Sequence, residues 1–225
     1  MRSFFGVVAL GAVSAGCAVG QKIDYADVTP GLVAHASIAL GLAVQDRRPE
    51  VLSGEKSGVY VGALRAGFGN RWDLETQSGR PLADDMAGVI GRALAARGYQ
   101  VTAAAAPTPD VPGAIVARAG RVGAARVLEV QIGAWNSDTY MGTKLTYDVT
   151  ARVLEVPSGR LLGVARVAAA RDLGASFWDP GSHAKQAIPP AYAGAIQALL
   201  DAAPIVAALG DAPPPPPPAP APGRS

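Results

Sequence analysis

The residue types that most often perform catalysis or hold metal ions are scarce in this chain of 225 residues, which has one cysteine and two histidines. His35 lies far from His183, and only Asp179 near His183 could join it as a ligand. Metal sites usually need three or four ligands. Ser176 or Ser182 could complete a Ser-His-Asp set only on paper, since no Gly-x-Ser-x-Gly turn is present. We therefore interpret Asp179 as a helix cap and expect no catalytic residue, no metal and no cofactor other than a covalent lipid.

Cys17 is the residue whose position most clearly indicates covalent chemistry. It follows a basic N-terminus, at Arg2, and an apolar run over 4–16. That layout is typical of a secretory signal and is too short to span a membrane. Residues 14–17 (SAGC) resemble the lipobox of bacterial lipoproteins, although Ser14 stands where that family usually has leucine. The resemblance implies cleavage before Cys17 and acylation of its sulfur and amine. Ordinary secretion, with cleavage near Ala18 or Gly20 and loss of Cys17, is the alternative; both predict export.

Composition and charge divide the chain into four parts. We expect a signal peptide over 1–16, a lipidated tether over 17–29, a single domain over 30–210 and a proline-rich disordered tail over 211–225. Ala18 after the cysteine favours, by resemblance to sorting in two-membrane bacteria, the inner leaflet of the outer membrane, facing the periplasm. Loss of the leader removes only one of the 20 basic residues, which then nearly balance 18 acidic ones. This balance argues against nucleic acid as a partner.

Hydrophobic periodicity predicts an α+β fold. Residues 144–153 alternate polar and apolar side chains, as in a strand with one solvated face. Pro81 opens an amphipathic helix that ends near Gly98. We expect further strands at 33–44, 59–64, 99–101, 126–135 and 161–170, helices at 114–123 and 186–209, and an irregular segment at 65–80. The order β-β-α-β-α-β-β-β-α predicts a mixed, mostly antiparallel sheet with helices packed on one face.

Four segments resemble the YajG-like family of bacterial envelope lipoproteins: 44–49 (VQDRRP), 79–86 (GRPLADDM), 97–101 (RGYQV) and 135–140 (WNSDTY). The resemblance covers about 33–200. It implies an envelope location and no assigned activity or catalytic residue. The same order of elements is similar to modules of other periplasmic assembly lipoproteins, which is a fold-level analogy only.

The side chains most suited to recognition gather in predicted loops and strand ends. Binding surfaces are enriched in Trp, Tyr and Arg. We expect a binding rim at one end of the sheet, formed by Phe68, Asn70, Arg71, Trp72, Trp135, Asp138, Tyr140 and Trp178. The alternative is that these aromatic side chains fill a core otherwise rich in alanine. The rim predicts a non-enzymatic module that binds an envelope protein or a cell-wall component. The alternative function is binding of a small molecule or lipid in a pocket between sheet and helices.

Overall fold

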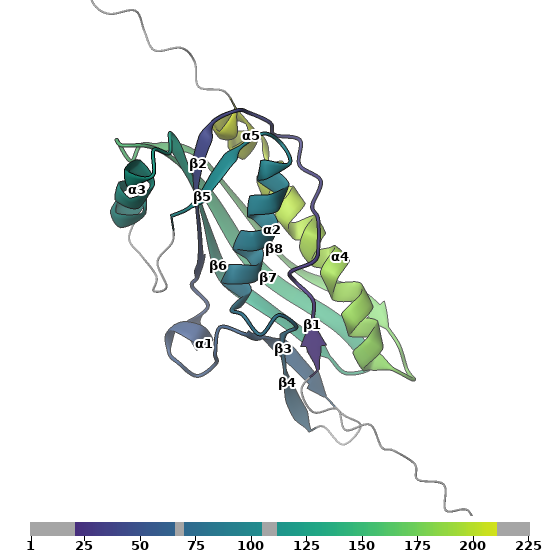
Figure 1. Ribbon diagram of the computed structural model, residues 1–225. Coiled ribbons are helices and arrows are strands. Elements are labelled where there is room, and N and C mark those ends of the chain that lie inside the picture. Colours follow the sequence, from purple (N-terminus) through teal and green to yellow (C-terminus); the bar gives the residue numbers. More distant parts are fainter. Residues whose placement is uncertain (1–20, 66–69, 105–111, 211–225) are drawn as a thin grey trace, which may run out of the picture.

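The computed structural model describes residues 21–65, 70–104 and 112–210 (Figure 1). The leader, Cys17 and the proline-rich tail lie outside these residues. In chain order the elements are β1 (Lys22–Ile23), β2 (Ala39–Asp46), α1 (Pro49–Leu52), β3 (Tyr60–Arg65), β4 (Arg71–Thr76), α2 (Leu82–Ala95), β5 (Gln100–Ala103), α3 (Pro112–Arg121), β6 (Arg126–Thr139), β7 (Gly142–Glu155), β8 (Leu161–Ala175), α4 (Pro180–Leu200) and α5 (Ala203–Leu209).

The strands form one mixed sheet in which β6 is the branch point. Along one edge, β6 pairs with antiparallel β7 over most of its length, and β7 pairs with antiparallel β8. Along its other edge, β6 pairs first with parallel β2 and then, at its C-terminal end, with parallel β3. Strand β5 extends the β2 branch, and β4 with β1 extends the β3 branch. The predicted α+β class with a mixed sheet is confirmed.

Helices α2, α4 and α5 cover one face of this sheet, and their apolar side chains share one large core with the strands. A second, smaller core lies on the other face of the sheet. The side chains of β2 alternate between the two cores, because Leu42 and Val44 face the large core while Ala43 faces the small one. Helix α3 packs on that opposite side: a Cβ added at Gly41 would lie 3.0 Å from the Cβ of Ala119. One helix therefore departs from the predicted single-faced arrangement.

The segment predicted as a long irregular loop contains a strand, so that expectation was wrong. Strand β4 pairs antiparallel with β3, with Leu64 opposite Trp72. Its own sequence alternates, since Leu74 and Thr76 are buried while Arg71 and Asp73 are exposed. A period of two over six residues is a strand signal, which the flanking glycines obscured.

Residues 21–29, predicted as the distal part of a tether, belong to the folded domain. Strand β1 pairs with β4, and the side chains of Ile23 and Tyr25 are fully buried in the core. Burial of two large apolar side chains fixes this segment in place. Any tether that follows Cys17 is therefore limited to residues before Gln21.

The last helical region also differs from its prediction. Helix α4 begins at Pro180, where Asp179 accepts a hydrogen bond from the Ser182 amide (2.9 Å), and it contains the prolines expected at its start. The expected kink at Pro204 is a break between α4 and α5, whose axes differ by 67°. No single helix among the described residues is long and apolar enough to cross a membrane, although this bent pair passes by combined length and composition.

Candidate functional site

Among the described residues, the predicted rim positions lie toward one end of the sheet. Trp135, however, is buried and does not belong to the surface. Register places Leu64 of β3 beside Thr139 of β6, so the β3–β4 and β6–β7 ends are neighbours. Asn70 is exposed, Trp72 is half-buried, Tyr140 is 43% exposed and Trp178 is 94% exposed. Phe68 lies outside the described residues. The structure therefore brings together most of the predicted positions without showing what they bind.

Trp135 corrects the rim prediction, because its side chain is fully buried. Its ring stacks on Tyr147 and meets Tyr25 and Tyr192 edge to face. Its indole N–H donates to the Tyr25 hydroxyl at 3.0 Å. The alternation of β6 turns Trp135 toward the helix-covered face, where it fills a core made otherwise of small aliphatic side chains. For this residue the alternative interpretation, a core aromatic, is the correct one.

Two other predicted rim residues are engaged within the molecule on the face opposite α4. Arg71 donates to the Tyr60 hydroxyl (2.9 Å), which donates to the Asn136 amide oxygen (3.0 Å). Asp138 accepts two hydrogen bonds from the Arg65 guanidinium, at 2.9 and 2.6 Å. These pairs join β3, β4 and β6 across the branch of the sheet. A partner on this face would have to compete with them.

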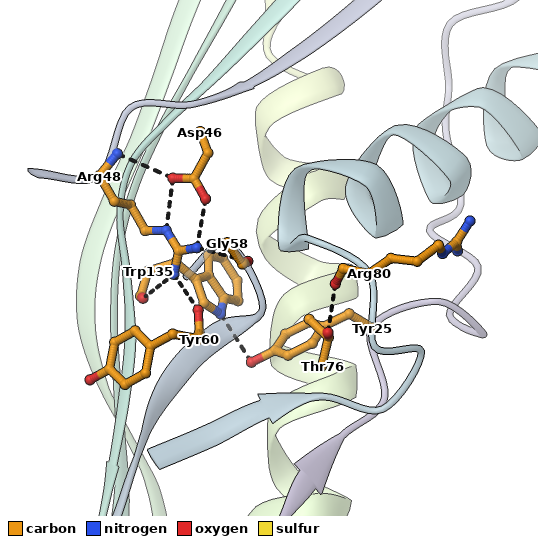
Figure 2. A network of polar contacts seen from close by, with 8 residues as sticks. All are labelled: Tyr25, Asp46, Arg48, Gly58, Tyr60, Thr76, Arg80 and Trp135. Carbon is orange, nitrogen blue, oxygen red and sulfur yellow. Dashed lines mark hydrogen bonds and ion pairs between the residues drawn. The ribbon is translucent and has the colours of Figure 1, made fainter. Parts of the chain in front are cut away.

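A fully buried arginine, which sequence reasoning did not single out, holds the branch together (Figure 2). The Arg48 guanidinium binds both carboxylate oxygens of Asp46, at 2.8 and 2.6 Å. It also donates to the carbonyls of Tyr60 (2.5 Å), Gly58 (3.3 Å) and Trp135 (3.4 Å). These carbonyls lie in or beside the short stretch of β6 between its pairing with β2, which ends at Ile132, and its pairing with β3, which begins at Ser137. The planar fork of arginine thus bridges these acceptors, of which the Gly58 carbonyl also accepts from the Leu82 amide at 2.9 Å.

An open groove lies between α2 and strands β2 and β5. Its volume is about 1070 Å³. Leu42, Val44 and Val101 form its floor, and Leu52 of α1, 53% exposed, stands at one end. The wall on α2 combines the charged Asp84 and Arg92 with small residues at helical spacing, namely Ala83, Ala87, Gly88, Gly91 and Ala95. The lining is mostly apolar and could contact an apolar ligand, although Leu42 and Val44 in its floor are only 5% and 7% exposed.

Strand β8 forms a long edge of the sheet. It has 15 residues and, within the described part of the chain, pairs only with β7. The Arg166 guanidinium on β8 donates two hydrogen bonds to Asp148 on β7, at 2.7 and 2.6 Å. These bonds lower the pKa of the Asp148 carboxyl. From Val167 to Ala170 the strand carries no charge. Unpaired edges of this kind are templates for another strand.

Aromatic side chains protrude between β8 and α4. Phe177 is 75% exposed and its ring centroid lies 6.1 Å from that of Trp178. The Ser176 amide donates to the Met141 carbonyl at 3.1 Å, which places the β6–β7 turn beside this connection. Tyr140 and Met141 are themselves about half exposed. We call these four residues, Tyr140, Met141, Phe177 and Trp178, the aromatic tip.

The histidines form no reactive cluster with the groups considered from sequence. His35 is exposed, and the His183 ring nitrogen lies 3.1 Å from the Leu173 carbonyl. Asp179 caps α4, as predicted, and its hydrogen bonds from Ser182 lower the pKa of its carboxyl. No group of three or more His, Cys, Asp or Glu that could hold a metal occurs among residues 21–65, 70–104 and 112–210.

No protein-family model matches this chain, and no curated protein matches it. Solved structures with some similarity include a Xanthomonas campestris protein of the DUF330 family model (15% identity, TM-score 0.45, 77% of this chain and 90% of that one). Others are the PelC dodecamer from Paraburkholderia phytofirmans (13%, 0.44, 80% and 95%) and the LpoB C-terminal domain from Salmonella enterica (11%, 0.31, 63% and 88%). Such values assign neither family nor function.

Proposed function

We propose that this protein is a YajG-like lipoprotein, anchored through Cys17 to the periplasmic face of the outer membrane, that binds another envelope protein without catalysing a reaction. The observation that carries the binding role is the β8 edge. Among the described strands only β7 pairs with it, and on one side; on the other side its 15 residues offer a row of main-chain donors and acceptors, apart from the Leu173 carbonyl beside His183 and the Gly174 amide bonded to Asp172. An extended segment of a partner protein would add to this edge as a further strand.

The chemistry of β8 favours a protein strand over a cell-wall glycan. Main-chain hydrogen bonds supply the affinity in strand addition, and alternate side chains supply specificity. Val164 is 47% exposed, and Ala168 and Ala170 are exposed on the same face. These small side chains let a second backbone approach closely, whereas natural edges that must stay free carry lysine or proline.

Site-specific photocrosslinking in intact cells tests this proposal. A photoreactive residue is placed at Ala168 on β8 and, as a matched control, at exposed Ala96 after α2. We expect an adduct with another envelope protein at Ala168 that disappears when Ala170 is changed to lysine, with no change in the urea midpoint. Adducts that form equally at Ala96, that survive Ala170→Lys, or that contain only a second copy of this chain would refute partner binding through β8.

The groove favours a second candidate function, binding of a small apolar molecule or lipid. Gly88 lines the groove, and a Cβ added there meets only the end of the Arg92 side chain, at 3.5 Å. Leucine at this position would therefore extend into the groove. Gly194 on α4 is a matched control, because it is exposed and its added Cβ meets nothing within 4 Å.

An environment-sensitive apolar dye measures this second function. We expect Gly88→Leu to abolish dye binding and Gly194→Leu to leave it unchanged, while both changes raise helix propensity by a similar amount. Equal dye binding by both variants would exclude the groove as the ligand site.

A further inference from the structure

The aromatic tip is an apolar surface, exposed to solvent where the β6–β7 turn meets the connection between β8 and α4. Trp178 is 94% exposed and Phe177 75%, and the turn beside them adds Tyr140 and Met141 at 43% and 48%. Large apolar side chains that gather on a surface mark a site of interaction. Tryptophan and tyrosine are the side chains that prefer the boundary between lipid headgroups and acyl chains, because one end of each is apolar and the other polar.

The start of the folded domain lies at the same end of the molecule as this tip. A Cβ added at Gly181, in the first turn of α4, would lie 2.5 Å from the Gln21 side chain. The Gln21 carbonyl accepts from the Glu75 amide at 3.2 Å. Strand β1, which Gln21 directly precedes, lies at the β3–β4 end of the sheet, where it runs parallel to β4 (Figure 1).

Cys17 precedes Gln21 by four residues. Four residues span at most about 14 Å when fully extended. A lipid on Cys17 would thus keep Gln21, and the first turn of α4 beside it, within about 14 Å of the bilayer surface. Helix α5 lies at the opposite end of the domain (Figure 1).

We propose that the aromatic tip enters the interface of the bilayer that holds the Cys17 lipid, and so fixes the orientation of the domain on the membrane. This inference rests on the proposed lipid anchor. A few aromatic side chains bind a bilayer weakly by themselves. The anchor removes most of that limitation, because it keeps the tip at a high effective concentration beside the surface.

The single cysteine allows a test that does not depend on lipidation in the cell. The chain from Cys17 onward is coupled through its thiol to a maleimide-headgroup lipid in phosphatidylethanolamine–phosphatidylglycerol vesicles with brominated acyl chains. Trp72→Phe serves as background, which leaves buried Trp135 and exposed Trp178 as fluorophores. We expect coupling to shift Trp178 emission to the blue, to protect it from aqueous acrylamide and to expose it to bromine quenching. Protein mixed with vesicles but not coupled is expected to show none of these changes.

Two variants separate the tip from a general apolar effect. Phe177→Ser is expected to lose most of the bromine quenching of Trp178, whereas Val122→Ser, at an exposed apolar site after α3, is expected to retain it. Coupled protein whose Trp178 stays accessible to acrylamide and insensitive to bromine would overturn the inference. Metabolic labelling with a fatty acid tests the Cys17 anchor separately, so that failure of the anchor and failure of the tip give different results.

Discussion

Replacement of Arg48 by methionine is the sharpest test of how the sheet is held together. Methionine keeps most of the apolar stem and removes the guanidinium. The change leaves the Asp46 carboxylate, only 12% exposed, without its cation, and it leaves the carbonyls of Tyr60, Gly58 and Trp135 without this donor. Breaking a buried ion pair by removing one partner costs roughly 3–5 kcal/mol.

The Tyr60 and Trp135 carbonyls add to that cost, at about 1–3 kcal/mol for each one that is left without a donor and that water cannot reach, whereas the Gly58 carbonyl still accepts from the Leu82 amide. Apolar packing of the methionine side chain offsets part of this loss of stability. We therefore expect Arg48→Met to lower the free energy of unfolding by about 4–6 kcal/mol. Domains of this size are stable by only about 5–15 kcal/mol, so the variant should be marginal at room temperature. The double variant Asp46→Asn/Arg48→Met is expected to regain stability, because it removes the uncompensated buried charge.

Urea unfolding followed by tryptophan fluorescence and by far-ultraviolet circular dichroism measures this effect. Trp135 is a suitable probe, since it is fully buried and its carbonyl accepts from Arg48. Arg160→Met is the matched control, because the Arg160–Glu155 ion pair is exposed and its loss should leave the midpoint unchanged. A loss of stability in Arg48→Met no greater than in Arg160→Met would refute the assignment of Arg48 as the group that satisfies the branch.

Three further predictions follow from single features of the structure. Gly62→Ala should destabilise the domain by about 3 kcal/mol or more in urea unfolding, because Gly62 has φ +147° and an added Cβ would lie 2.1 Å from the Ser137 carbonyl oxygen; an unchanged midpoint would contradict this. Burial raises the pKa of Tyr25 and Tyr192, so both favour the neutral form in the fold, and stability that is complete below about pH 10 should fall above it as the unfolded chain ionises. Tyrosinate absorbance should then show that Tyr25 and Tyr192 titrate only with unfolding, and titration of all tyrosines in the folded state would exclude it. Cys17→Ser should abolish fatty-acid labelling and release the protein from the membrane fraction, whereas labelling that persists would exclude Cys17 as the acylated residue.

The sequence was informative wherever a pattern was local. Period-two alternation identified β7, and helical spacing after Pro81 identified α2, because each reflects one wet and one buried face. The branch at β6 has no local signature. It depends on Arg48 meeting carbonyls as far away as Trp135, 87 positions along the chain. The same limit misplaced Trp135, since an aromatic side chain near a strand end is equally suited to a rim and to a core.

The groove was anticipated only as a pocket between sheet and helices, the alternative to a rim. Its residues carry a weak signal, the small side chains Ala87, Gly88, Gly91 and Ala95 on one face of α2. Such a stripe more often allows close packing of two elements than it leaves a space. Whether it is filled depends on how far α2 stands from β5, which is a matter of tertiary packing and cannot be read from periodicity.

The arrangement of the three surfaces connects the proposals. Strand β8 ends at Ala175, directly before the aromatic tip, and begins at Leu161 toward the opposite end of the domain (Figure 1). With the tip in the bilayer interface, the free edge of β8 rises from the membrane surface into the periplasm. A partner strand would then meet an edge held in one orientation, and part of the entropy cost of alignment would already be met by the anchor. Loss of the tip through Phe177→Ser should therefore weaken the Ala168 crosslink in cells without touching β8, whereas the lipid-free protein in solution should bind the isolated partner equally well with or without the substitution.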